Sequence, residues 1–374
     1  MIMLYVSFAA CGADYNDTVP AIVEVDTIMV SQVGLDSVSS RPWYRQLRDN
    51  GYRFDEPTIN YPAFIRFCLK LYEWGDRTFN NYDEEYVEGV GKNWKLTAKS
   101  YNWMTSYTMF FKKNERLHLR SDIYNDVGAY VSFMALSLGY TAKMDNLIGR
   151  SIKKRENFNF NFTLSLFSAS FNFYKTIGDT KITKFGAYPG LKSAKMNFDA
   201  LRTESYSGQA YFFFNHRRYS HAAAYSFSKY QLKSSGSAIL GVNFNHQSVD
   251  MDFSSLPADM KSYLPALMDI YRFRYNDYEV MGGYGYSWVP RPRRWLLNVT
   301  ILPSLGYRHS YHNSTEGSRD MVSTSVRAMF SVTFNHKDMF VNLNGFNNGR
   351  LYIGRGFTFW DSMQALSVTL GCRF

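Results

Sequence analysis

The last thirteen residues, Ser362 to Phe374, constrain the fold most, because apolar side chains alternate there with small or polar ones. The apolar positions are Leu366, Val368, Leu370, Cys372 and Phe374, and the positions between them are Ser367, Thr369, Gly371 and Arg373. A period of two residues predicts a β-strand whose two faces meet different surroundings. The strand ends on an aromatic residue, with no residue after it in the sequence.

This ending is similar to the terminal strand of a bacterial outer-membrane β-barrel. The resemblance implies that Phe374 is an assembly signal read by the barrel assembly machinery. We therefore predict an all-β protein, a transmembrane antiparallel up-and-down barrel in the outer membrane of a Gram-negative bacterium.

The composition agrees with a barrel. Aromatic residues make up 18% of the 374 residues, with 29 Tyr and 30 Phe, and mean hydropathy is negative. No run approaches the roughly 18 apolar residues that a spanning helix needs, which excludes a helical membrane protein. Barrel strands expose only every second residue to lipid, so they combine modest hydropathy with abundant Tyr, Phe, Gly, Ser and Asn.

The net charge of +10 is spread along the chain without a dense basic run. This pattern favours lipopolysaccharide phosphates or small anionic solutes as partners over nucleic acid. The three cysteines, Cys11, Cys68 and Cys372, do not have the spacing of a disulfide framework or a zinc site. We expect no cofactor and no metal.

The first 93 residues do not alternate. Residues 1–13 are predicted to be a signal peptide, truncated at its start because a basic segment is missing; in an alternative, Cys11 is a lipoprotein cysteine. Residues 14–93 are predicted to form a periplasmic extension with a turn of helix at Pro42 to Leu47 and one amphipathic helix at Tyr61 to Trp74. This helix could plug the barrel mouth, although packing against its rim is the favoured interpretation.

Alternation starts at Trp94 and continues to the end, which predicts a barrel over residues 94–374 with about twelve strands. The predicted strands are 94–112, 127–142, 156–176, 206–214, 219–230, 236–245, 247–253, 277–289, 294–308, 321–334, 338–346 and 362–374.

If Phe374 lies in the periplasm, counting backwards assigns every connection to one side. The tight connections at 215–218, 245–246, 290–293 and 335–337 fall on the periplasmic side. The longer ones at 177–205, 254–276, 309–320 and 347–362 fall outside the cell, as is usual for such barrels.

The sequence contains few signs of catalysis. The seven histidines form no metal-protease motif, and three of them follow Phe-Asn in what we interpret as strand ends and turns, at His216, His246 and His336. His309 and His312 flank a serine in a predicted outer loop, where solvated histidines are favoured over a metal or hydrolase site. We therefore expect no enzymatic activity and keep a membrane hydrolase as a minor alternative.

Two further motifs are weak. Gly89-Val90-Gly91-Lys92 lacks the spacing of a phosphate-binding loop. The acidic cluster at residues 83–85 could hold calcium, but a solvated stretch is favoured. On the predicted inner face, Lys95, Lys99, Arg327 and Arg373 stand against Glu279 among Ser, Thr and Asn. This basic lining would favour anionic solutes, although charged residues in barrel lumens are also commonly paired with one another. Of these, Lys95, Lys99, Glu279 and Arg327 are the candidate lumen-lining residues.

Several motifs resemble a family of Bacteroidota outer-membrane proteins described as a domain of unknown function (4421). They are YVEGVGKNW at 86–94, YFFFN at 211–215, RYS at 218–220, AAA at 222–224, QLKSSGS at 231–237, GYGYSWV at 283–289, WLLN at 295–298 and PSLGY at 303–307. The resemblance covers roughly residues 80–374, departs slightly at Leu232-Lys233-Ser234, and implies a barrel fold but no activity.

Two functions therefore compete. The first is a narrow channel or transporter for small polar or anionic solutes. The second is a non-conducting outer-membrane scaffold that interacts through its loops and extension.

Overall fold

The computed structural model describes a barrel and part of a small second unit. The described residues are 2–5, 42–50, 59–63, 65–66, 70, 81–92, 94–112, 115–133, 136–144, 155–192, 195–311, 315, 319–354 and 356–374. One unit comprises residues 1–12 and 81–374, and the other comprises residues 13–80.

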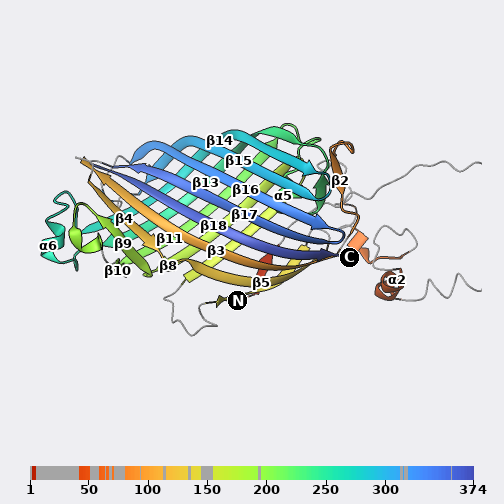
Figure 1. Ribbon diagram of the computed structural model, residues 1–374, viewed down its shortest axis with the longest axis horizontal. Helices are drawn as coiled ribbons and strands as arrows, with labels where there is room; N and C mark the ends of the chain where they lie inside the picture. Colours follow the sequence, from red (N-terminus) through yellow and green to blue (C-terminus); the bar gives the residue numbers. More distant parts are fainter. Residues whose placement is uncertain are drawn as a thin grey trace, which may run out of the picture. The chain divides into compact units, whose positions relative to one another are not determined.

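One antiparallel sheet dominates the first unit and curls into a barrel (Figure 1). Twelve strands follow one another in the order β6-β5-β3-β18-β17-β16-β15-β14-β13-β11-β8-β7, and β1 pairs with β6. Their bounds are β1 Ile2–Tyr5, β3 Trp94–Phe111, β5 Tyr124–Phe133, β6 Leu136–Lys143, β7 Arg155–Thr163, β8 Phe167–Ile177, β11 Leu201–Phe213, β13 Ser235–Asp252, β14 Ile270–Arg291, β15 Trp295–Ser310, β16 Asp320–His336, β17 Met339–Ile353 and β18 Phe357–Arg373.

Shorter elements lie at the two ends of the barrel. At the end opposite Phe374 are β4 (Arg116–Ser121), β9 (Thr180–Phe185), the 3₁₀-helix η2 (Pro189–Lys192), β10 (Met196–Phe198) and α6 (Ala258–Lys261). At the Phe374 end are β2 (Val87–Gly89), α5 (His221–Tyr225) and β12 (Lys229–Gln231), with β2 and β12 forming a separate two-stranded sheet. We call these the loop end and the Phe374 end.

The predicted all-β antiparallel fold is confirmed. Several predicted strand bounds are wrong, but the errors cancel in the total number of strands, because two predicted strands are split, two others are merged into one and one is absent. The ranges 127–142 and 156–176 are each two strands, because alternation runs on through short turns such as Leu164–Leu166, which contain no Gly, Pro or Asn. Conversely, 236–245 and 247–253 form the single strand β13, and the turn predicted at 245–246 is wrong. The strand predicted at 219–230 is also wrong, since this range holds α5 and the short β12.

The barrel is apolar outside and polar inside, the reverse of a soluble protein. On β14, Tyr278, Val280, Tyr284, Tyr286 and Trp288 are 46–59% exposed, whereas the intervening Asp277 and Glu279 are at most 4% exposed. From Tyr278 to Trp288 the strand covers about 34 Å at about 3.4 Å per residue. At the tilt of about 40° usual in membrane barrels this gives roughly 26 Å of height, close to their apolar band of about 25 Å.

The second unit is described in part. Its α2 (Trp43–Asp49) agrees with the predicted turn of helix, and Leu47 packs with Ile59 and Tyr61. Most of the predicted helix at 61–74 lies outside the described residues, as do most of the predicted signal peptide and Cys11. Within the part of the chain that the structure describes, no helix is long and apolar enough to cross a membrane.

Candidate functional site

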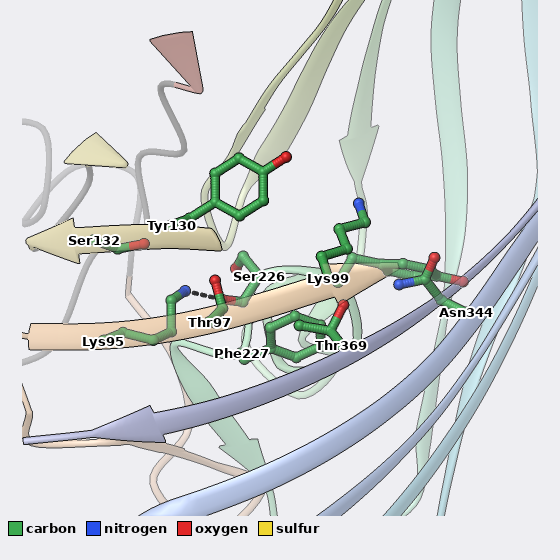
Figure 2. A pocket seen from close by; sticks show the side chains of 10 residues that line it. Lys95, Thr97, Lys99, Tyr130, Ser132, Ser226, Phe227, Asn344 and Thr369 are labelled. Atoms are coloured by element: carbon green, nitrogen blue, oxygen red, sulfur yellow. Dashed lines mark hydrogen bonds between the residues drawn. The ribbon is translucent and has the colours of Figure 1, made fainter. Parts of the chain in front are cut away.

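The four residues predicted to line the lumen all lie on the inner face of the sheet. Lys95 and Lys99, two residues of β3 on one face, line the same small cavity at the Phe374 end (Figure 2). Glu279 on β14 accepts hydrogen bonds from Asn243 Nδ2 at 2.6 Å and from two serine hydroxyls of β16 at 2.5 and 2.6 Å. Arg327 on β16 donates to Gln209 Oε1 and stacks on the Phe346 ring. The structure therefore brings the two lysines together and gives the other two separate partners.

Long polar side chains bridge the middle of the barrel. Arg350 on β17 donates to Asn245 and, at 2.8 Å, to Gln247, both on β13, which lies four strands away in the sheet order. Arg308 donates to both carboxylate oxygens of Asp277 at 2.5 and 2.9 Å, and both side chains are 1% exposed. A further cavity in this layer measures only about 20 Å³, about enough for one water molecule.

A thirteen-residue segment, Tyr219 to Gln231, closes the Phe374 end, and we call it the end plug. It connects β11 to β13 and includes α5 and β12. Its backbone carbonyls are bound by barrel side chains: Lys95 Nζ donates to Ser226 O at 2.8 Å, Ser331 Oγ to Ala224 O at 2.7 Å and Arg373 Nε to Phe227 O at 3.2 Å. These donors come from β3, β16 and β18, so several barrel strands hold the plug.

Local sequence explains the fold of the plug. The Ser220 hydroxyl caps α5 by accepting from Ala223 N at 3.1 Å, and three alanines follow the cap. The helix ends after five residues, where Phe227 adopts a φ of 60°. Its ring then packs on Phe340 with centroids 4.7 Å apart.

Buried polar groups fix the inner side of the plug. The hydroxyl of Tyr219 accepts from Asn298 Nδ2 at 3.0 Å, and Tyr225 donates to Asn298 Oδ1 at 3.0 Å. Burial raises the pKa of Tyr219 to about 12 and lowers the pKa of His221 to about 3. At neutral pH the plug therefore holds an uncharged histidine against the barrel interior.

The segment before β3, which includes β2, binds the plug through strand pairing and side-chain contacts. Strand β2 pairs with β12 through Val87, Glu88 and Gly89, and Glu88 forms a bidentate ion pair with Arg293 at 2.7 Å. Gln231 Nε2 donates to Tyr86 O at 3.2 Å and to Arg218 O at 2.6 Å. Residues 81–93 thus belong to the barrel unit, whereas the sequence placed them in the extension.

The acidic cluster at 83–85 takes part in this fastening. Asp83 pairs with Arg218 at 3.2 Å and Glu85 pairs with Lys233 at 2.7 Å. The guanidinium of Arg218 also stacks on the Tyr86 ring, 4.9 Å from its centroid. These two carboxylates are therefore bound to cations of the 214–234 connection, and calcium is not needed to explain their proximity.

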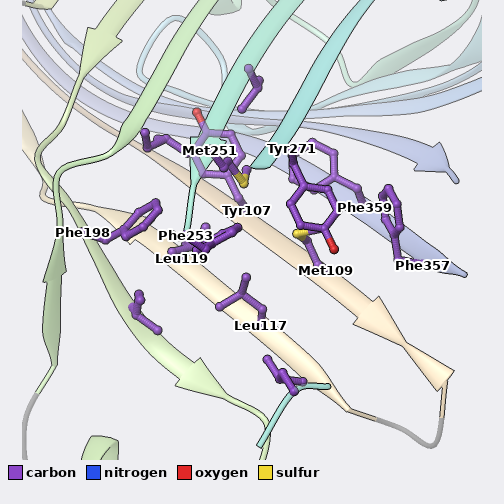
Figure 3. Close-up of a cluster of buried hydrophobic side chains, with 14 of the residues drawn as sticks. Tyr107, Met109, Leu117, Leu119, Phe198, Met251, Phe253, Tyr271, Phe357 and Phe359 are labelled. Carbon is purple, nitrogen blue, oxygen red and sulfur yellow. The ribbon is translucent and has the colours of Figure 1, made fainter. Parts of the chain in front are cut away.

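The loop end is closed differently, by an aromatic core (Figure 3). It joins buried side chains of β3, β4, β9, β10, β13, β14, β17 and β18 with the segment around α6. The rings of Phe273 and Phe359 stack at its centre with centroids 4.3 Å apart and planes 1° apart. We call this cluster the loop-end core.

A cavity of about 90 Å³ opens beside the end plug. Its walls carry Lys95 and Lys99 together with hydroxyl and amide groups: Thr97, Tyr130, Ser132, Asn344 and Thr369 (Figure 2). The plug contributes Tyr225, Ser226 and Phe227. Two cations and several neutral hydrogen-bonding groups therefore line one cavity in the barrel interior.

The predicted histidine sites do not come together as an active site in the described residues. His309 lies on the outer face and bonds Asp320 Oδ1 at 3.1 Å, while Ser310 is buried on the inner face. His312 lies outside the described residues. His246 lies within β13 and bonds Asn276 Oδ1 at 2.6 Å. No group of three or more potential metal ligands occurs in the described part of the chain.

The final residue pairs with the first residue of the barrel. Phe374 N donates to Trp94 O at 2.9 Å, Trp94 N donates to Phe374 O at 3.1 Å, and the two rings stack. The assembly role of Phe374 remains a prediction.

Sequence reasoning missed the end plug because it extended the alternating pattern through it. Two signals were available: the Ser-x-x-Ala cap at 220–223 and the run of three alanines, which favours helix over strand. The motifs that carry the family resemblance gather here. The motifs at 218–224 and 231–237 overlap the plug, the one at 86–94 pairs with it through β2, and those at 283–289 and 295–298 lie on β14 and β15, where Asn298 bonds Tyr219 and Ser287.

None of the curated proteins compared with the chain matches it. Solved structures that align with it include outer-membrane barrels. The outer membrane protease OmpT from Escherichia coli has 9% identity and a TM-score of 0.33, with 78% of this chain and all of that chain covered. The translocator domain of the autotransporter NalP from Neisseria meningitidis has 8% identity and a TM-score of 0.28, with 83% and 96% covered. These alignments are too loose to bear on function.

A family model matches residues 81–374, which includes the whole barrel from β2 to β18 together with the end plug. The chain belongs to the family described as "Domain of unknown function (DUF4421)".

Proposed function

We propose that this protein is an outer-membrane β-barrel that does not conduct in its resting state and acts as a scaffold, presenting its loops and its plugged end to other molecules. The outward apolar band of about 25 Å supports the membrane placement. The Phe374 end, with the N-terminal extension attached to it, faces the periplasm in this proposal, and the loops face outwards. Lipid, lipopolysaccharide and the barrel assembly machinery are its proposed partners.

The observation that carries the proposal is that both ends of the barrel are occupied in the described residues. The loop-end core occupies one end, the end plug occupies the other, and Arg350 reaches from β17 to β13 in the layer between them. Twelve-stranded barrels lie between those that side chains fill and those that leave an open channel. In this one, within the part of the chain that the structure describes, side chains occupy both ends, and two cavities of the interior measure about 90 and 20 Å³.

Planar-bilayer recording tests the scaffold function directly. The purified wild-type protein is expected to insert without discrete conductance steps, because the loop-end core and the end plug occupy the two ends of the barrel among the described residues. Steps from the wild type that disappear when the plug is fixed by a disulfide to the barrel wall would contradict the proposal.

The second candidate is a narrow channel for small polar or anionic solutes, favoured by the cavity that Lys95 and Lys99 line beside the end plug. Replacing residues 220–229 by a short Gly-Ser connection would open this end. If the channel function holds, the variant conducts, and adding Lys95→Gln, Lys99→Gln and Arg327→Gln shifts its preference away from anions. Deleting residues 14–80 is the matched control, because it removes chain outside the barrel unit.

Phe374 is proposed to act in assembly as well as in pairing. Phe374→Lys should lower the amount of folded, heat-modifiable protein in the outer membrane, because it removes an interfacial aromatic residue. Phe374→Tyr is the control that keeps the ring. Equal amounts of folded protein for both variants would show that the ending is ordinary strand sequence.

A further inference from the structure

An apolar groove of about 500 Å³ opens on the outer face of the barrel near the Phe374 end. It lies across four neighbouring strands, β3, β18, β17 and β16. One small side chain stands in a row of larger ones across the groove: Ala98 pairs with Leu370, Leu370 with Val341, and Val341 with Phe334. The groove is therefore a depression in the lipid-facing band, produced by a small residue among large ones.

Exposed cations stand where the groove meets the end of the barrel. His336 lines the groove and Lys337 follows it in the β16–β17 turn, where its φ of 51° belongs to the turn conformation. Arg294 is in the neighbouring turn, and its carbonyl accepts from Asn335 N at 2.8 Å. Within the described residues neither Arg294 nor Lys337 forms an ion pair.

Other cations at this end are already neutralised. Arg218, Lys233 and Arg293 pair with Asp83, Glu85 and Glu88 respectively. Arg294 and Lys337 are both exposed, and Asp338, which follows Lys337, pairs with Lys92 at 3.8 Å.

We propose that this groove binds one glycerophospholipid, with an acyl chain in the groove and the phosphate of its headgroup on Arg294 and Lys337. The acyl chain matches an apolar lining that continues the lipid-facing band, and the phosphate matches cations at headgroup level. The inference rests on the proposed membrane placement and orientation, which put this end in the inner leaflet. It does not depend on whether the barrel conducts.

The test is lipid retention by detergent-purified protein, followed by native mass spectrometry during titration with phosphatidylglycerol. The wild type should retain one phospholipid that Ala98→Phe loses, with affinity at least about tenfold lower because the new ring fills the groove. Arg294→Gln with Lys337→Gln should also weaken binding about tenfold or more. Both positions lie in exposed turns, so this variant keeps the test valid even if Ala98→Phe fails to fold.

Two matched controls separate a site from general lipid contact. Ala210→Phe adds the same ring to the outer face of β11, away from the groove, and Arg202→Gln with Arg217→Gln removes two exposed cations elsewhere. Both should bind like the wild type. Equal loss in the controls, or no loss in the groove variants, would overturn the proposal.

Two further ligands identify what is bound. Diacylglycerol, which lacks the phosphate, should bind at least about tenfold more weakly than phosphatidylglycerol. Inorganic phosphate should not displace the lipid, and displacement at millimolar phosphate would mean an anion site without lipid. Conductance by the wild type would contradict the scaffold function alone, whereas loss of selective lipid retention would contradict this inference alone.

Discussion

The two closed ends of the barrel are built on different physical principles. The loop-end core consists of apolar side chains that belong to the strands themselves or to loops between them. The end plug is a separate segment between β11 and β13. Barrel side chains bind three of its backbone carbonyls, and its own side chains add hydrogen bonds to Asn298 and apolar contacts with Leu296 and Phe340.

The loop end is thus closed by the barrel strands and their loops, whereas the Phe374 end is closed by a segment that is not a barrel strand. The loop-end core cannot open without exposing buried aromatic side chains, which costs about 25 cal/mol for each Å² of apolar surface. The end plug can in principle leave without removing a strand, since β11 and β13 pair directly over thirteen positions. Of the two described ends, the Phe374 end is the one that can open without disrupting a barrel strand.

The strongest test of the comparison is Phe273→Ala in the loop-end core. Loss of the ring stacked on Phe359 should lower the free energy of unfolding by about 3–5 kcal/mol, because it leaves a cavity in a fully buried cluster. Urea unfolding followed by heat-modifiable gel mobility measures this. The control Val280→Ala, at a side chain 59% exposed on the outer face, should change it by less than about 0.5 kcal/mol in detergent. Equal effects would remove the distinction between the core and the outer band.

The next effect concerns the end plug and pH. Burial lowers the pKa of His221 from its ordinary 6.5 to about 3, so the folded state resists protonation. This contribution to stability is complete above pH 6.5 and is lost as pH falls from 6.5 towards 3. Between pH 7 and pH 5 the loss should be about 2 kcal/mol.

His221→Gln should flatten this part of the pH profile, measured by proteolysis within residues 219–231. Exposed His336→Gln serves as the control and should leave the profile unchanged. A wild-type profile that is already flat would show that protonation is relieved by water entering the plug.

A smaller effect is expected from Tyr219→Phe. The variant loses the hydroxyl that accepts from Asn298, but Asn298 Nδ2 keeps its bond to Ser287 Oγ at 2.9 Å. The expected loss of stability is about 1 kcal/mol, and cleavage of the plug by protease should accelerate before the barrel unfolds. Simultaneous loss of plug and barrel would mean that the plug is as integral as the loop-end core.

The smallest effect should come from Glu88→Gln on the outside of the plug. Glu88 and Arg293 are 30% and 65% exposed, and exposed ion pairs contribute about 0.2–1 kcal/mol. The difference from the wild type should vanish in about 1 M salt, where charges are screened within about 3 Å. A salt-independent difference would point to the β2–β12 pairing instead of the ion pair.

Alternation made the barrel predictable. The period of two at β15, β16 and β18 follows from lipid on one face and a polar interior on the other, so the class, the pairing direction and the tight turns near 290–293 and 335–337 could be inferred. The bounds of β13 could not be inferred, because the consecutive polar residues Asn245 and His246 lie on opposite faces of the strand and each has its own polar partner. Asn245 bonds Arg350 inside, and His246 bonds Asn276 outside.

The candidate site was predictable only in part. The alternation of strand residues places Lys95, Lys99, Glu279 and Arg327 on the inner face. It does not predict which of these side chains come into contact, because contacts across the barrel depend on strands that are far apart in the sequence. The partners of Glu279 come from β13 and β16. The end plug escaped because a five-residue helix is stabilised by tertiary contacts and leaves a weak local signal.

The contact between Arg373 and the end plug joins a segment in the middle of the sequence to the last strand of the barrel. The plug is synthesised more than 140 residues before Arg373, whose guanidinium bonds Phe227 O and, at 3.2 Å, the hydroxyl of Tyr230. Until β18 pairs with β17 and β3, the plug lacks this cation and the wall on which Arg373 stands. Docking of the plug is therefore complete only after β18 has paired: without the last strand, the segment at 219–231 lacks the bonds from Arg373.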